Sequence, residues 1–170
     1  MIAFAVRRAI ERGLPLGALE GQLRKRFGET HGEAVSIVIG TATQPVTLED
    51  LRLALDTIAP RLAGSPDDGI WSRGKRLLSD LVVLRQADSP SPRAADRLRR
   101  ARRALDEGNV EAALAEVARM PGAADAQSWT SAAKRYIASR NALREIEVAA
   151  METSGETSGA TSTAPASAAR

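Results

Sequence analysis

The fold is decided by residues 96–151, which read DRLRRARRALDEGNVEAALAEVARMPGAADAQSWTSAAKRYIASRNALREIEVAAM. Leu98, Ala101 and Leu105 are spaced three and four residues apart, and the apolar residues of 110–117 repeat that spacing. Such spacing places apolar side chains along one face of an α-helix, which must then be buried. The stretch therefore begins with two amphipathic helices.

The connection between these two helices is a Gly108-Asn109 pair. Glycine suits the left-handed position that follows a helix. Asparagine suits an N-cap, where its side-chain oxygen accepts a hydrogen bond from a free backbone N–H. We therefore predict a helical hairpin with a very short turn, and we expect Pro121-Gly122 to end its second helix with another.

A third helix follows the hairpin and carries a heptad stripe about three repeats long. The stripe comprises Trp129, Ala132, Tyr136, Ser139, Leu143, Ile146 and Ala150. This length is marginal for a coiled coil, so packing against the preceding hairpin in a small bundle is the favoured interpretation.

The chain before the hairpin also has helical character. We predict short helices over residues 3–12 and 16–27 and a longer one beginning at Thr47, where Asp50 completes a capping pattern. Residues 35–39 form a short apolar run with strand propensity. A lone strand without a partner is unstable, so we interpret the run as helix. Together with the low aromatic content of 3%, these patterns predict an all-α fold of six or seven helices.

Composition divides the chain into three regions. Residues 1–46 hold the short helices, and residues 47–152 form the main helical domain. Residues 153–170 consist mostly of Ser, Thr, Gly, Ala and Pro. Such a segment cannot bury enough apolar surface to offset the entropy of ordering, so we predict a disordered tail.

Catalytic and metal-binding residue sets are missing from the sequence. The chain has no cysteine and a single histidine, His31. Disulfides, thiol nucleophiles and cysteine-ligated zinc are therefore excluded, and a His-based metal cluster or Ser-His-Asp triad has little to build from. No glycine-rich phosphate loop is present either. We predict a non-enzymatic protein without a cofactor, a metal or a small-molecule substrate.

A cationic stretch opens the hairpin, because residues 93–103 contain six arginines and one aspartate, a formal charge of +5. The predicted cationic surface consists of Arg97, Arg99, Arg100, Arg102 and Arg103. Phospholipid headgroups and an acidic protein are the candidate ligands, and a solvated face without a ligand is the alternative. Nucleic acid is disfavoured, because no aromatic side chains interleave with the arginines for base stacking.

A second cationic segment, residues 70–85, has four basic residues and one aspartate, a formal charge of +3. An aromatic residue at one end, a basic cluster and an apolar face are typical of a helix that lies in a membrane interface. The candidate lipid-binding residues are Trp71, Arg73, Lys75 and Arg76. Burial of Leu77 to Leu84 at the centre of the domain is the competing interpretation.

Several stretches together resemble the C-terminal domain of alphaproteobacterial mitofilins. They are Arg100 to Leu114, Met120-Pro121-Gly122, Trp129, and Ala133 to Leu143. The resemblance implies a non-enzymatic scaffold that supports inner-membrane architecture from the periplasmic side through lipid and protein contacts, with a second copy of the chain among the candidate partners. It also implies lipid-binding helices just before the terminal hairpin, where residues 70–85 lie.

The chain departs from the mitofilin pattern at its beginning. Mitofilins carry an N-terminal transmembrane helix and a coiled coil, whereas no stretch here approaches the roughly 20 apolar residues needed to span a bilayer. We expect either a fragment of a longer protein or a short variant, which would be cytoplasmic if Met1 is the true start. The alternative function is a soluble tetratricopeptide-like adaptor that binds an acidic protein through the cationic surface.

Overall fold

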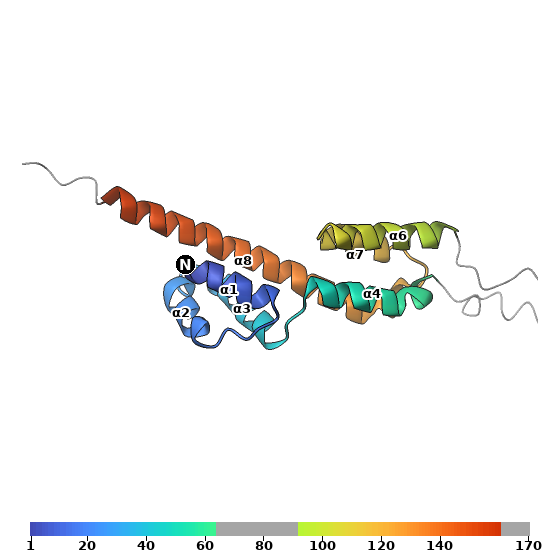
Figure 1. Cartoon of the computed structure of the whole chain (residues 1–170), viewed down its shortest axis with the longest axis horizontal. Coiled ribbons are helices and arrows are strands. Elements are labelled where there is room, and N and C mark those ends of the chain that lie inside the picture. Colours follow the sequence, from blue (N-terminus) through green and yellow to red (C-terminus); the bar gives the residue numbers. More distant parts are fainter. Residues whose placement is uncertain (64–91, 161–170) are drawn as a thin grey trace, which may run out of the picture. The chain divides into compact units, whose positions relative to one another are not determined.

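The computed structural model describes residues 1–63 and 92–160 (Figure 1). Within these residues every regular element is helical, which confirms the predicted all-α fold. The helices are α1 (Ile2–Glu11), α2 (Ala18–Phe27), α3 (Gly32–Thr43), α4 (Leu48–Leu62), α6 (Pro92–Asp106), α7 (Val110–Val117) and α8 (Gln127–Ala160), with a short 3-10 helix, η1 (Ala123–Ala126), before α8.

The described residues form two compact units. Unit 1 contains residues 1–47 and 135–160, and unit 2 contains residues 48–63 and 92–134. The boundary lies beside the predicted division between residues 46 and 47. Residues 135–152, which we placed in the same domain as the hairpin, instead belong with the N-terminal helices. Their apolar face explains this, because Leu143 and Ile146 share a core with Val6.

Unit 1 consists of α1, α2, α3 and the second part of α8. Its core draws on each of these helices: Val6, Ile10, Leu23, Phe27, Val35, Val38, Leu143 and Ile146. In α3 the buried residues Ala34, Val35, Val38 and Ile39 follow helical spacing. The interpretation of residues 35–39 as helix is therefore confirmed, since this spacing gives the apolar run one face to bury.

Unit 2 consists of α4, α6, α7, η1 and the first part of α8. Its core comprises Leu51, Leu55, Leu62, Ala101, Leu105, Val110, Val117, Met120 and Trp129. The predicted hairpin is confirmed: α6 and α7 pack against each other, Gly108 has a φ of +73°, and the Asn109 side chain accepts a hydrogen bond from the backbone N–H of Ala112 at 3.0 Å. Both turn residues therefore serve as their types predict.

The connection from α7 to α8 is longer than predicted. α7 ends at Val117, and residues 118–126 follow as turns and the 3-10 helix η1. Within this connection the backbone N–H of Gly122 donates to the Leu62 carbonyl at 3.2 Å. The connection is held against the end of α4, so Pro121-Gly122 forms a packing contact rather than a simple helix stop.

Helix α8 buries the predicted stripe over both units. Trp129 lies in unit 2, whereas Ser139, Leu143 and Ile146 are buried in unit 1, so the stripe does not pack on the hairpin alone. The helix also continues to Ala160, past the point at Thr153 where we predicted disorder to begin. That prediction is corrected for residues 153–160, because extending an existing helix adds a hydrogen bond for each residue ordered. Residues 161–170 lie outside the described part.

Candidate docking surface on helix α6

The cationic surface predicted on α6 is built around one carboxylate of α7. Arg100 donates to Glu116 through Nε at 3.0 Å and through a terminal nitrogen at 3.1 Å. Arg97 donates to the same carboxylate at 3.3 Å. The Glu116 side chain is only 19% exposed and accepts hydrogen bonds from both guanidinium groups. These bonds join the two helices of the hairpin.

The same contacts shift the ionisation of both partners. The hydrogen bonds from Arg100, supported by those from Arg97, lower the pKa of Glu116 below 4.5. Hydrogen bonding to Glu116 correspondingly raises the pKa of Arg100. Donors to a carboxylate favour its charged form, which is the physical cause of both directions. The carboxylate of Glu116 and the guanidinium of Arg100 are therefore both charged at neutral pH, and their attraction stabilises the hairpin.

Two more arginines of the surface also have acidic partners. Arg102 donates through Nε to Asp56 of α4 at 2.8 Å, and Arg99 pairs with Asp96 one turn earlier in α6. Arg103 is exposed and, in the part of the chain that the structure describes, has no ion-pair partner. Four of the five predicted arginines are thus paired within unit 2. The formal charge of +5 falls to +3 once Asp56 and Glu116 are counted with the stretch.

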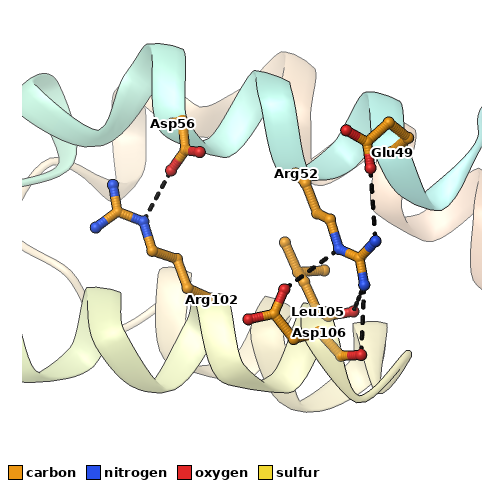
Figure 2. A network of polar contacts seen from close by, with 6 residues as sticks. All are labelled: Glu49, Arg52, Asp56, Arg102, Leu105 and Asp106. Atoms are coloured by element: carbon orange, nitrogen blue, oxygen red, sulfur yellow. Dashed lines mark hydrogen bonds and ion pairs between the residues drawn. The ribbon is translucent and has the colours of Figure 1, made fainter.

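Figure 2 shows a further contact that sequence reasoning missed, made by Arg52 of α4. One terminal nitrogen of Arg52 donates to the carbonyl oxygens of Leu105 and Asp106, at 3.1 and 3.3 Å, at the end of α6. Its Nε lies 3.4 Å from the Asp106 carboxylate without an aligned hydrogen bond. Arg52 therefore caps the C-terminus of α6, where the helix dipole favours a cation.

The sequence contains a signal for this region, but it points to a different pairing. Arg52 and Asp56 are spaced i, i+4 in α4, which suggests an ion pair within the helix. In the structure Arg52 pairs within α4 with Glu49 at 3.5 Å and also reaches the end of α6, whereas Asp56 binds Arg102 of α6 (Figure 2). Partners this far apart in sequence become visible only once α4 and α6 are placed together.

The remaining predicted residues fall into two groups. The stripe residues Trp129, Leu143 and Ile146 are buried, while Ala132 and Tyr136 are half-buried, with the Arg140 guanidinium 5.9 Å from the Tyr136 ring centre. The candidate lipid-binding residues Trp71, Arg73, Lys75 and Arg76 lie outside the described residues, as does the whole segment 70–85.

A groove of about 260 Å³ in unit 1 is lined by Ile37, Gly40, Thr41, Gln44, Arg135 and Ala138. Its lining is mostly apolar, and Arg135 donates to the Gln44 side chain at 2.9 Å.

Among residues 1–63 and 92–160, no three acidic or histidine side chains gather in a metal-binding arrangement. No helix in these ranges combines the length and apolar character needed to cross a bilayer.

We expect Glu116→Gln to lower the free energy of unfolding by about 1 kcal/mol at neutral pH, because two arginines lose a charged acceptor. Folding lowers the pKa of Glu116 from its unfolded value near 4.5. The ionised carboxylate therefore contributes its full stabilisation above pH 4.5, and this stabilisation is lost as the pH falls through the pKa of the folded state. Urea unfolding at pH 7 and pH 3 should therefore show the difference from wild type shrinking in acid. Glu111→Gln, exposed on the same helix, is the control, and a loss that is equal at both pH values contradicts this assignment.

Comparison with known proteins identified no relative of this chain: no protein-family model, curated protein or solved structure matches it. The resemblance to mitofilins consequently rests on the residues quoted above, and the function implied by it is a proposal.

Proposed function

We propose that this chain is a non-enzymatic, membrane-organising scaffold of the mitofilin type, which supports inner-membrane architecture through lipid and protein contacts. Lipid contact is assigned to residues 70–85, where Trp71 stands beside Arg73, Lys75 and Arg76. An indole prefers the headgroup region, and cations near it attract anionic lipid.

The observation that carries this proposal is the pairing of the arginines on α6. The competing function, a soluble adaptor for an acidic protein, needs the surface of Arg97 to Arg103 to be free. Glu116 instead holds Arg97 and Arg100, and Asp56 holds Arg102. An acidic partner would have to compete with these carboxylates, which already occupy three of the five arginines and lower the formal charge from +5 to +3. The basic cluster beside Trp71 is then the favoured candidate for an external anion.

Co-sedimentation with vesicles tests this proposal. We expect the full chain to bind vesicles that contain phosphatidylserine and to bind neutral phosphatidylcholine vesicles weakly. Each basic residue near an anionic membrane contributes about 1 kcal/mol, so changing Arg73, Lys75 and Arg76 together to Ala should weaken partitioning roughly 100-fold. Trp71→Ala should weaken it further on both kinds of vesicle.

The chain offers a matched control for the charge change. Arg24, Lys25 and Arg26 of α2 have the same residue types in the same order and are exposed. Changing these three to Ala removes equal charge from another helix and should leave vesicle binding within about threefold of wild type, because only cations beside the inserted indole act at short range. Equal losses in the two triple variants would mean that net charge, and not residues 70–85, drives binding. Absence of binding to both vesicles would favour the adaptor.

A further inference from the structure

The groove of about 260 Å³ in unit 1 lies between α3 and α8. Its α3 wall consists of Ile37, Gly40, Thr41 and Gln44. These residues follow one another at steps of three and four, so they share one face of the helix. Arg135 and Ala138, which are three residues apart on α8, form the other wall. The groove is therefore built from two helix faces of the same compact unit.

Small residues on both walls leave this space open. Gly40 has no side chain, and a Cβ atom placed there would meet no other atom within 4 Å. Ala138, on the opposite wall, contributes only a methyl group. Side chains normally fill the space between two packed helices. The space beside Gly40 is unfilled and lined mostly by apolar atoms, so it suits an apolar group from outside the chain.

The groove has one charged lining residue, Arg135. One of its terminal nitrogens donates to the Gln44 side-chain oxygen at 2.9 Å, which holds the guanidinium beside the last lining residue of α3. Arg135 is exposed and has no ion-pair partner in the part of unit 1 that the structure describes. A guanidinium has five N–H donors in a fork that matches a carboxylate. Donors for a bound anion therefore stand at one end of an apolar groove.

The size of the groove favours a small molecule over a protein. A stable protein interface takes about 20 to 30 residues from each partner, whereas six residues line this groove. At about 30 Å³ for each water-sized group, a volume of about 260 Å³ holds roughly nine such groups. A linear chain of about eight carbons is of this size. Arg135 disfavours a cation, and an inorganic anion would leave the apolar walls uncovered.

We infer that the groove between α3 and α8 binds a small amphiphilic carboxylate with a linear apolar tail of about eight carbons. The carboxylate accepts hydrogen bonds from Arg135, and the tail lies along Gly40 and Ala138. This site is separate from the lipid contact proposed for residues 70–85. Because the groove is open on one side and the ligand is small, the dissociation constant is on the order of 300 µM.

Titration of the full, ¹⁵N-labelled chain with octanoate, without vesicles, tests the inference by nuclear magnetic resonance. We expect the backbone amide signals of Gly40 and Ala138 to shift and to saturate as octanoate rises to about 5 mM. Butyrate has the same head and a shorter tail, so it should bind at least roughly 10-fold more weakly, since each methylene removed from water contributes to binding. Absence of a saturable shift with octanoate overturns the inference.

A charge change on each side of the contact tests the role of Arg135. Octanol lacks the charge and should bind about 10-fold more weakly than octanoate. Arg135→Gln should weaken octanoate binding about 10-fold and leave octanol binding within about twofold, whereas Arg135→Lys should retain most of the octanoate affinity. Arg144→Gln, an exposed arginine farther along α8, is the control and should bind octanoate as wild type does. Equal losses of octanoate and octanol in Arg135→Gln overturn the carboxylate assignment.

Filling the groove from within completes the test. Gly40→Leu places a side chain in the open space and should abolish saturable octanoate binding, followed at the Ala138 amide. Gly21→Leu makes the same change on α2, where a Cβ atom also has no neighbour within 4 Å, and should bind octanoate as wild type does. Circular dichroism of each variant verifies that the helices persist. A Gly40→Leu variant that is folded and binds octanoate with wild-type affinity overturns the inference.

Discussion

Replacing Trp129 with alanine should lower the free energy of unfolding by about 4 kcal/mol, because a large buried aromatic side chain is removed from a packed core. Trp129 is 2% exposed, and its indole N–H donates to the Leu51 carbonyl at 2.9 Å. The side chain thus fills the centre of unit 2 and links the start of α8 to α4. Urea denaturation followed by circular dichroism measures the loss.

Trp129→Phe separates the two contributions of the indole. Phenylalanine keeps most of the apolar volume but has no N–H group for the Leu51 carbonyl, so we expect a smaller loss of about 1–2 kcal/mol. If Trp129→Ala costs less than 1 kcal/mol, the indole is not the packing centre of unit 2.

Gly122→Ala should have the second largest effect, a loss of about 3 kcal/mol. A Cβ atom at position 122 would lie 2.0 Å from the Arg61 carbonyl oxygen and 2.9 Å from the Leu62 Cα. Both are backbone atoms of α4 and cannot move aside by rotation of a side chain. The connection must therefore separate from α4, and the hydrogen bond from the Gly122 N–H to the Leu62 carbonyl is lost with it.

Gly21→Ala is the matched control for this substitution. Gly21 lies within α2, and a Cβ atom there would have no neighbour within 4 Å. Alanine is the better helix former, so this variant should gain up to about 1 kcal/mol. Opposite signs in urea unfolding would confirm that the cost at position 122 comes from the close approach to α4. A gain at both positions would contradict it.

Local patterns in the sequence were sufficient to predict the hairpin. Gly108 and Asn109 have turn roles that depend on their own φ angle and side chain, and both are observed. The buried faces of α6 and α7 follow equally from three- and four-residue spacing. Such features need no knowledge of the rest of the chain, which explains why they could be predicted.

Features that depend on distant residues could not be predicted in the same way. The stripe on α8 gives the buried face but not the partner, so the packing of Ile146 on the N-terminal helices was missed. The arginines of α6 appeared to be a free cationic surface, because their partners Asp56 and Glu116 come from other helices. Gly122 resembled an ordinary helix stop, although it makes a close backbone contact with α4.

The most direct test of the proposed membrane function uses the two tryptophans of the chain. In Trp129→Phe the indole of Trp71 is the sole tryptophan, and its fluorescence reports the surroundings of the proposed lipid contact. The account predicts a shift of emission to shorter wavelength when phosphatidylserine vesicles are added and little shift with phosphatidylcholine vesicles, because the indole enters the interface beside bound headgroups. Trp71→Phe, which keeps only the buried Trp129, should show no shift. Unchanged emission of Trp71 at saturating phosphatidylserine would contradict the account.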